Sequence, residues 1–411
     1  MRLDAYGDLA VRVALNLQQG QRLLIIGPLV NGGVSLEAAP LVRAVAASAY
    51  RAGAELVEPI WGDETLLLSR FQLAGRDTLT SYSRWLPNAL VEHVERGGAT
   101  LSIYANDPDL LASQPTDLVG ALQQAVSRDV VPFRQLISRN ATNWAVIAAA
   151  GDAWAAKVFP DAPTNERCDR LWQTIARLCR LDRPDPVAAW QDHLKALAER
   201  SEYLNAKRYS ALRFRGPSTD LTVGLPAGHV WVSGQSTSRN NIPFVANIPT
   251  EEVFTLADRA RVDGTVRATK PLSYGGSLIE GFSVTFKDGR VVNLSAARGE
   301  HTLRQMVDTD DGAGRLGEVA LVPHGSPIAQ SGLLFYNTLF DENAASHVAL
   351  GTAYKFTLAG GETMDEEAFA KAGGNKSAIH VDFMIGSGEI DVDGVTGSGA
   401  SEPVMRSGEW V

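Results

Sequence analysis

Short apolar runs alternate with longer segments of helical period through the first two hundred residues of the chain. Residues 22–27 (Arg-Leu-Leu-Ile-Ile-Gly) form an apolar run that stops at Gly-Pro, which is typical of a buried strand. Apolar residues follow at helical spacing over residues 41–54. The strand pattern returns at residues 55–61, 99–104 and 143–148, with helical stretches between these runs. This alternation predicts an N-terminal α/β domain with a mostly parallel sheet and helices on its faces.

The pattern changes in the middle of the chain. Residues 164–208 are rich in Ala, Leu, Arg and Glu and are expected to be helical, with a break at residues 183–186. Short strands with turn signals follow, at residues 210–214, 220–223, 230–233 and 283–292. The Asp288-Gly289 pair in the last of these predicts a β-hairpin. We therefore expect an α/β domain over residues 1–205, followed by a strand-rich α+β catalytic domain over residues 206–411.

Composition and charge narrow the class of protein. With 411 residues the chain is long enough for two or three domains, each with a core of its own. Hydrophobic residues make up 45% and charged residues 21%, which is the usual balance of a soluble globular protein. The net charge is -9 and no run of Lys or Arg stands out. These features argue against nucleic acid or an anionic membrane as a partner.

The two cysteines bear on the compartment. Cys168 and Cys179 fall in one segment that is expected to be helical, about 16 Å apart along the helix axis, which is too far for a disulfide. Two thiols in so long a chain fit a reducing compartment. Asp4 and Asp8 interrupt the apolar core that a signal peptide needs, and no 18 apolar residues run together. We expect a cytoplasmic protein without a membrane span.

Acidic residues and histidines with metal-ligand character gather in the last two-fifths of the chain. Their carboxylate oxygens and imidazole nitrogens suit Zn²⁺, Co²⁺ or Mn²⁺. They are more numerous than one tetrahedral ion requires, so the pattern favours a two-metal hydrolytic site. The candidates are Glu251, Glu252, Glu318, Glu342, His347, His380 and Asp382.

Local context gives each candidate a functional and a plain structural interpretation. His380 and Asp382 precede an apolar run, and residues two apart in a strand share a face, so they can bind one ion together. The alternative is a surface histidine beside a solvated aspartate. Glu318 heads a run of apolar residues, and a buried carboxylate is costly unless it is paired or bound to metal. The alternative is a glutamate in water at a strand end. For Glu251 and Glu252, alternation allows only one to face inward and leaves open which.

The segment 341–347 is predicted to begin a helix. Asp341 or Asn343 would cap a helix whose body carries His347 and, about 10 Å further along the same side, Tyr354. Glu342 stands five residues before His347, so the two do not face each other on a regular helix. They share a site only if the turn before the helix is irregular. The structural alternative is the ordinary preference of acids for a helix start.

Two partial motif matches and one absent motif argue against other kinds of site. Residues 312–317 (Gly-Ala-Gly-Arg-Leu-Gly) match a dinucleotide fingerprint, but acidic residues stand where its strand is required, so we expect a loop. Residues 391–394 resemble a calcium loop, with Glu402 at its twelfth position, but Val395 and Thr396 stand where a ligand and a glycine are required. The chain contains no His-Glu-x-x-His, so a thermolysin-like zinc site is excluded.

Five segments in fixed order resemble the thermophilic metalloaminopeptidases of the M29, or aminopeptidase T, family. They are residues 247–255 (Asn-Ile-Pro-Thr-Glu-Glu-Val-Phe-Thr), 316–322 (Leu-Gly-Glu-Val-Ala-Leu-Val), 335–344 (Phe-Tyr-Asn-Thr-Leu-Phe-Asp-Glu-Asn-Ala), 346–354 (Ser-His-Val-Ala-Leu-Gly-Thr-Ala-Tyr) and 380–386 (His-Val-Asp-Phe-Met-Ile-Gly). The likeness extends to residues 12–21 and 49–53 and so covers essentially the whole chain. One departure is Leu256-Ala257, where a proline-containing turn is expected in relatives.

The resemblance implies a metal-dependent aminopeptidase that removes N-terminal residues from peptides with a free N-terminus. It implies two divalent ions (Zn, Co, Mn or Mg) that activate a hydroxide, and homodimers that enclose the site in a cavity. The implied ligands are Glu252, Glu318, Glu342, His347, His380 and Asp382, with Glu318 between the ions. Glu252 is thereby selected over Glu251. Tyr354 matches the active-site tyrosine of the family and would stabilise the oxyanion, while Glu252 would relay the proton.

Two other functions were weighed against this one. Ring-cleaving dihydroxypyridine dioxygenases look like distant relatives and use one iron held by two histidines and an aspartate, which His347, His380 and Asp382 would supply. The glutamates would be pointless around a single iron, so the hydrolase is favoured. A non-catalytic binding protein on the same scaffold would have lost a ligand, and every expected ligand is present in the sequence.

Overall fold

The computed structural model describes residues 2–274 and 277–411, and its contacts divide into two compact units. Unit 1 comprises residues 1–194, 235–249 and 335–339, and unit 2 comprises residues 195–234, 250–334 and 340–411. The division in the middle of the chain falls inside helix α9 (Pro186–Lys207), at residue 195, whereas the sequence pattern placed a boundary near residue 205. Two short segments of the second half thus belong to unit 1, which no change of pattern along the chain indicates.

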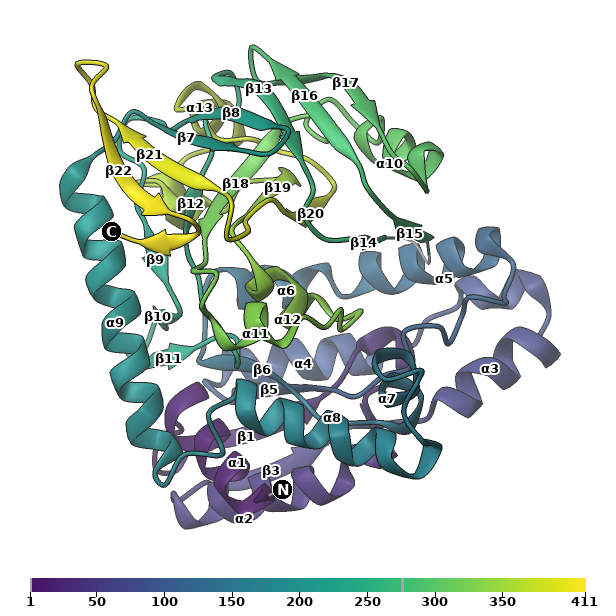
Figure 1. Cartoon of the computed structure of the whole chain (residues 1–411). Coiled ribbons are helices and arrows are strands. Elements are labelled where there is room, and N and C mark those ends of the chain that lie inside the picture. The colour runs from purple at the N-terminus through teal and green to yellow at the C-terminus, as the bar shows by residue number, and fades with distance from the viewer. Residues whose placement is uncertain (1, 275–276) are drawn as a thin grey trace. The chain divides into compact units, whose positions relative to one another are not determined.

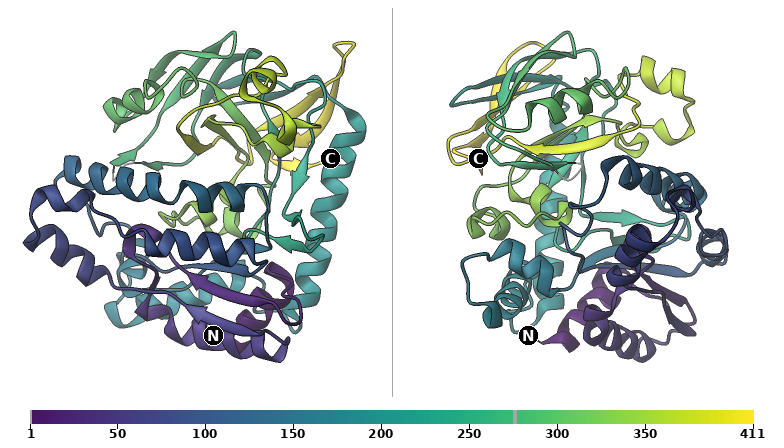
Figure 2. Two further views of the ribbon diagram at one scale, coloured as in Figure 1. Left: turned by 180° about the vertical axis from the view of Figure 1, so that it is seen from behind. Right: turned by 90° about the vertical axis from the view of Figure 1, so that its right-hand side faces the viewer.

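Unit 1 is built on a four-stranded parallel sheet in the order β3-β1-β5-β6. Its strands are β1 (Arg22–Ile26), β3 (Leu56–Pro59), β5 (Ala99–Tyr104) and β6 (Trp144–Ala148). Helices lie beside this sheet in both views of Figure 2. They include α1 (Leu3–Leu9), α2 (Ala39–Arg51), α3 (Glu64–Leu73), α4 (Trp85–Glu95), α5 (Thr116–Asp129), α6 (Val131–Ser138), α7 (Asp152–Val158) and α8 (Thr164–Leu178). The predicted parallel α/β architecture is confirmed.

The helices of unit 1 are held to the sheet by apolar packing and by buried hydrogen bonds. Leu24 and Ile26 of β1 pack against Leu90 of α4 and Phe133 of α6. From α1, Tyr6 donates a hydrogen bond of 3.0 Å to the backbone carbonyl of Ala148 in β6. None of the helices in the described part of the chain is long and apolar enough to cross a membrane.

Unit 2 is strand-rich and contains two large antiparallel sheets beside the two-stranded pair β14 (Leu272–Tyr274) and β15 (Ser277–Ile279) (Figure 1). The five-stranded sheet has the order β20-β19-β18-β12-β9, and its strands are β9 (Val232–Ser233), β12 (Val253–Leu256), β18 (Leu316–Leu321), β19 (His347–Gly351) and β20 (His380–Met384). The eight-stranded sheet has the order β17-β16-β13-β8-β7-β21-β22-β23, with strands β7 (Ala211–Gly216), β8 (Thr219–Gly224), β13 (Val262–Arg267), β16 (Ser283–Lys287), β17 (Arg290–Ser295), β21 (Asp391–Val395), β22 (Ser401–Arg406) and β23 (Glu409–Trp410). The predicted hairpin joins β16 to β17, and both Asp288 and Gly289 have positive φ, as a tight hairpin turn requires.

One core joins the two sheets of unit 2. Val319, Val348 and Phe383 from the five-stranded sheet belong to the same buried cluster as Phe214 and Leu221 from the eight-stranded sheet. Because side chains alternate along a strand, one face of the five-stranded sheet is committed to this core. The residues between these apolar positions point from the opposite face.

The predicted helix at residue 347 is wrong. His347 is the first residue of strand β19, which pairs with β18 on one side and β20 on the other. The five residues of β19 are buried, so both faces of the strand are covered. Short apolar runs with both faces buried read alike as helix or strand, and here pairing with two neighbours decides for the strand.

A glycine allows β18 and β19 to approach closely beside Glu318. Gly317 lies at a register shift between Leu316 and Glu318. A Cβ atom on Gly317 would clash with the backbone oxygens of Gly351 and Thr352. Any side chain at this position would therefore push the two strands apart.

We expect Gly317→Ala to lower the free energy of unfolding of unit 2 by about 1–3 kcal/mol, because backbone atoms cannot yield as a flexible side chain does. Gly397→Ala is the matched control, since a Cβ there meets no atom within 4 Å. Differential scanning calorimetry of both variants measures the effect. Equal stability of the two variants would mean that β18 and β19 tolerate a wider spacing.

Candidate metal centre

Six acidic and imidazole side chains from distant parts of the sequence lie on neighbouring elements of unit 2. Four of them stand on three adjacent strands, one directly precedes β12, and one lies in the short 3₁₀ turn Glu342–Ala344. They are Glu318 on β18, His347 on β19, His380 and Asp382 on β20, Glu252 before β12, and Glu342 in the turn. The sheet order β20-β19-β18-β12 is the reason that segments up to 130 residues apart meet (Figure 1).

Strand register places these side chains on one face. Glu318 lies opposite Ala349, which in turn lies opposite Asp382, so the three share a face of the sheet. His347 and His380 are each two residues from a member of this row and therefore point the same way. This face is the one turned away from the core that joins the two sheets.

The same register separates Glu252 from Glu251. Leu256 pairs with Glu318, and counting back from it in steps of two reaches Phe254 and then Glu252. Glu251 has the opposite parity and is also buried, and its backbone N–H donates to Asn343 Oδ1 at 2.7 Å. Both glutamates precede the strand rather than lying in it, so the alternation that the sequence left open extends one step beyond β12.

Glu318 is common to two groups of potential ligands. Its Oε1 lies 3.7 Å from Nε2 of His347, and its Oε2 lies 3.8 Å from Nε2 of His380. Glu252, Glu318 and His347 form one group, and Glu318, His380 and Asp382 form the other. Within each group, one ligand atom from every residue lies within 4.8 Å of the others. A carboxylate with one oxygen toward each group is the geometry expected of a bridging ligand.

Backbone carbonyls orient both imidazole rings. Nδ1 of His347 lies 3.0 Å from the carbonyl oxygen of Ala345, and Nδ1 of His380 lies 2.8 Å from that of Thr352. A carbonyl only accepts, so Nδ1 carries the proton in both rings. The lone pair of each Nε2 then points toward the carboxylates, which is how metal-binding histidines are usually held.

The four carboxylates of the cluster outnumber its two imidazoles, so the buried side chains carry an excess of potential negative charge. Burial raises the pKa of Glu318, and it raises that of Glu342 well above its usual value together with the charges of Glu252 and Asp382. Burial alone would lower the pKa of His347, but the carboxylates of Glu252 and Glu318 raise it well above its usual value. These shifts show that the site takes up positive charge wherever a proton or a metal ion can supply it.

On β20, His380 and Asp382 shift each other's pKa values in the directions that favour an ion pair. Burial would lower the pKa of His380, but the charge of Asp382, 3.4 Å away, raises it to about 10. In return, the pKa of Asp382 is lowered: burial would raise it, but the charge of His380 outweighs that effect. Two buried oxygens face imidazole nitrogens: Glu252 Oε2 lies 3.1 Å from Nε2 of His347, and Asp382 Oδ1 lies 3.4 Å from Nε2 of His380. Among the described residues these oxygens have no other hydrogen-bond partner, so each oxygen and its facing nitrogen need a proton or a divalent cation between them.

Glu342 stands apart from the other five. It belongs to neither group of three, although its charge acts on Tyr354 and its own pKa responds to Glu252 and Asp382. The irregular turn that the sequence argument required between Glu342 and His347 is present as 3₁₀ turn followed by extended backbone at Ala345.

Tyr354 follows β19 and lies against His380, with the two rings 4.8 Å apart. Burial of the phenol, followed by the charges of Glu318 and Asp382, raises its pKa well above the usual value. The hydroxyl therefore stays protonated and available as a donor at neutral pH. Phe356 stacks on the Tyr354 ring at 5.3 Å, and Phe254 meets it edge-on at 6.5 Å. Sequence analysis missed both aromatic residues, although Phe254 shares the parity of Glu252.

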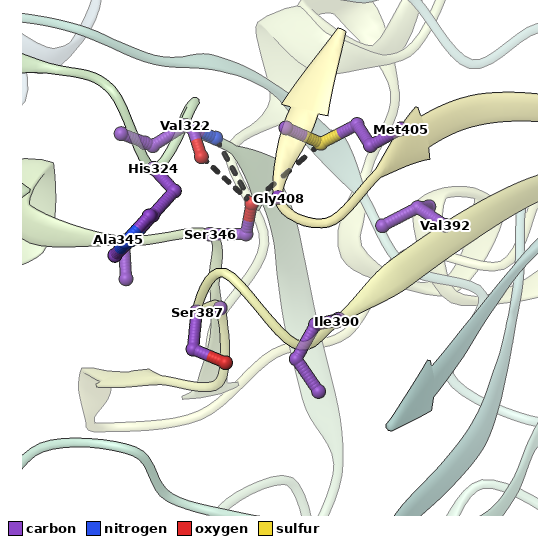
Figure 3. A pocket seen from close by; sticks show the side chains of 10 residues that line it. Val322, His324, Ala345, Ser346, Ser387, Ile390, Val392, Met405 and Gly408 are labelled. Carbon is purple, nitrogen blue, oxygen red and sulfur yellow. Dashed lines mark hydrogen bonds between the residues drawn. The ribbon is translucent and has the colours of Figure 1, made fainter. Parts of the chain in front are cut away.

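Ser346 ties the beginning of β19 to the end of β18, beside His347 (Figure 3). Its hydroxyl accepts from the backbone N–H of Val322 and donates to the carbonyl of the same residue, both at 3.1 Å. The small cavity around it measures about 10 Å³, which holds one water molecule at most. It is a packing space and not a substrate pocket. Its position directly before His347 was the one sequence signal for Ser346.

Comparison with known proteins shows that the chain resembles metalloproteases and aminopeptidases along almost its whole length. The family model described as thermophilic metalloprotease (M29) matches residues 1–410. The chain is 46% identical to aminopeptidase 2 of Geobacillus stearothermophilus over 408 residues, covering 99% of this chain and 97% of that protein. It is 45% identical to aminopeptidase T of Thermus thermophilus over 409 residues, covering 100% and 98% of the two chains.

Two solved structures resemble the chain to different degrees. Wild-type AmpT from Thermus thermophilus has a TM-score of 0.93 at 44% identity, with 100% of this chain and 98% of that chain covered. A 2,5-dihydroxypyridine dioxygenase from Pseudomonas putida KT2440 has a TM-score of 0.54 at 12% identity, with 100% and 97% covered. The second likeness concerns the fold alone.

We expect Glu318→Gln to weaken zinc binding at least about tenfold, because both groups of ligands lose a charged oxygen. Without metal, the same variant should melt at a higher temperature than the unmodified protein, since one buried negative charge is gone. Metal analysis after dialysis and calorimetry with and without zinc test the two halves.

Glu389→Gln serves as the control for Glu318→Gln, because Glu389 is an exposed carboxylate in the loop after β20. It should leave both metal content and melting temperature unchanged. Full zinc retention in Glu318→Gln would exclude Glu318 as a shared ligand.

Proposed function

The chain belongs to the M29 family of thermophilic metalloproteases and is a metal-dependent aminopeptidase, and we propose that its cluster of six side chains holds two divalent ions. The proposed ligands are Glu252, Glu318, Glu342, His347, His380 and Asp382. The position of Glu318 between two groups of three is the observation that carries the proposal. When bound, the ions lower the pKa of water, so that a nucleophile forms near neutral pH, and they act as Lewis acids.

The protein's own side chains would stabilise the developing charge, transfer a proton and hold the ligands in place. Tyr354, whose phenol keeps its proton, donates a hydrogen bond to the oxyanion that develops when the first peptide carbonyl is attacked. Glu252, whose buried Oε2 lies 3.1 Å from Nε2 of His347, relays a proton to the leaving amine. The carbonyls of Ala345 and Thr352 keep the two imidazoles in one tautomer throughout.

Specificity for the N-terminus would follow from the α-amine. In its neutral form a free α-amine has a lone pair that can bind a divalent ion held by the cluster. An internal peptide bond and an acetylated N-terminus offer no such lone pair. Peptides with a free N-terminus are therefore the proposed substrates.

Three finer points belong to the same proposal. The ions are Zn²⁺, Co²⁺, Mn²⁺ or Mg²⁺, all of which accept oxygen ligands, with the two imidazoles favouring the first three. A homodimer is proposed on the family resemblance. A cytoplasmic location is proposed because Cys168 and Cys179 are both free thiols.

The dioxygenase alternative is not favoured. His347, His380 and Asp382 would suffice for one iron, and a dioxygenase shares the fold. However, Glu252 and Glu318 would then be buried carboxylates beside the metal without a role, at a considerable cost in free energy.

The decisive experiment is reconstitution of the metal-stripped protein with one ion at a time. Aminoacyl amides should be hydrolysed, their N-acetylated forms should not, and activity should saturate at two ions per chain. Iron(II)-dependent uptake of oxygen in the presence of 2,5-dihydroxypyridine, without amide hydrolysis, would decide for the alternative.

Tyr354→Phe should lower kcat about 10²–10³-fold, the usual loss for one oxyanion donor. Metal content should not change, because the phenol is not among the ligands. Tyr203→Phe is the matched control, since it removes the same hydroxyl from a tyrosine on α9, a helix that carries none of the proposed ligands. An unchanged kcat in Tyr354→Phe, measured with an aminoacyl amide at saturation, would remove this role.

A further inference from the structure

Unit 1 contains a cavity of about 500 Å³ that has no part in the proposed hydrolysis. Its lining comes from β1, β5 and β6, from the residues directly after β1, and from α5 and α6 (Figure 1). The volume falls within the range of sites that enclose small organic molecules. We propose that this cavity binds a small organic acid whose carboxylate meets Arg134 and whose flat apolar body lies against Trp144.

The position of the cavity in the sheet supports a ligand site. The chain runs from β1 outward to β3, then returns past β1 to β5 and continues to β6, so the strand order reverses between β1 and β5. In open parallel sheets, ligands bind beyond the carboxyl ends of the strands at such a reversal. Gly27 and Pro28, directly after β1, and Tyr104, at the end of β5, line the cavity at this reversal, and the cavity extends along the sheet to Trp144 at the amino end of β6.

Hydroxyl side chains on β5 stand along the cavity. Ser102 is half-buried and lines it, so its hydroxyl is available to a ligand. Thr100 lies two residues earlier on the same face of the strand. Its Oγ1 is fully buried, so only the Ser102 hydroxyl is counted as part of the proposed site.

Arg134 supplies the charge. It lines the cavity from α6, and within residues 2–274 and 277–411 it forms no ion pair with a carboxylate. Its one side-chain hydrogen bond is a long contact of 3.4 Å to Ser127 Oγ. A guanidinium binds carboxylate or phosphate through two parallel N–H groups. Burial raises the pKa of Tyr104, and the positive charge of Arg134 lowers it. Both side chains line the cavity.

The rest of the lining selects the carboxylate over inorganic phosphate. Trp144, Phe133 and Ile137 give the cavity an apolar wall, which a phosphate ion would leave uncovered. An aromatic carboxylate would fill the volume, cover the wall and meet the guanidinium and the Ser102 hydroxyl. Binding needs none of the six residues of the metal centre, so it does not depend on the proposed hydrolytic function.

Isothermal titration calorimetry of the full chain in EDTA tests the proposal, with indole-3-acetate as the probe. Indole-3-acetate should bind, while indole-3-acetamide and inorganic phosphate should bind at least about tenfold more weakly. Arg134→Gln should raise the Kd for indole-3-acetate about tenfold or more, and Arg139→Gln, an exposed arginine at the end of the same helix, should not. Ser102→Leu, which fills the cavity from β5, should abolish binding.

Each contrary result overturns the proposal. Absence of heat with indole-3-acetate up to about 10 mM would exclude a site of this class. Equal Kd values for Arg134→Gln and Arg139→Gln would exclude the guanidinium as the anchor, and tighter binding of phosphate would exclude the flat carboxylate. Circular dichroism of each variant verifies the fold, and Ser102→Leu gives an independent answer if Arg134→Gln is unstable.

Discussion

Mutual repulsion among buried carboxylates is the constraint on which unit 2 depends. Four carboxylates and two imidazoles lie on or beside one face of the five-stranded sheet, and both imidazoles turn Nε2, the nitrogen that can take up a proton or a metal ion, toward the acids because backbone carbonyls hold their Nδ1 protons. Such an arrangement is unfavourable by itself, since burial penalises each charge and the charges repel one another. Protons relieve it in part, as the raised pKa values of His347 and His380 show. Divalent cations would relieve it fully, and the proposed catalytic site is therefore also a point of instability in the metal-free protein.

The five-stranded sheet accommodates this repulsion because one of its faces packs into the core and the other carries the metal centre. Along β18, β19 and β20, alternate residues belong either to the core shared with the eight-stranded sheet or to the metal centre. A shift of one residue in register would exchange the two sets and bury the acids in the core. Gly317, together with the hydrogen bonds between the Ser346 hydroxyl and the backbone of Val322, fixes the spacing of β18 and β19 on either side of the ligands. The precision of the site thus comes from backbone pairing more than from contacts among the ligands.

The likeness to a dioxygenase shows how little the fold alone decides. At 12% identity the two chains share an architecture, and the side chains that surround the metal decide the chemistry. Here, two additional buried glutamates distinguish a proposed two-metal hydrolytic site from a single-iron triad. The cavity proposed as a ligand site in unit 1 has the opposite chemistry, with a hydroxyl and a guanidinium that pairs with no carboxylate among the described residues, at the reversal point of a parallel sheet. The chain thus combines a cation-binding face in one unit with an anion-binding cavity proposed in the other.

The sequence by itself determined the two fold classes, most strand positions, the hairpin at Asp288-Gly289 and the candidate ligands, because these depend on local period, turn chemistry and residue type. It also identified the family, through several motifs in fixed order. It did not determine the strand at His347, since a short, mostly apolar buried run such as His-Val-Ala-Leu-Gly reads alike as helix or strand until its neighbours are known. Nor did it determine, without the family resemblance, which of Glu251 and Glu252 faces the ligands, or that Glu318 lies between two groups. Those features follow from the pairing of β12, β18, β19 and β20, which are adjacent only in the tertiary structure.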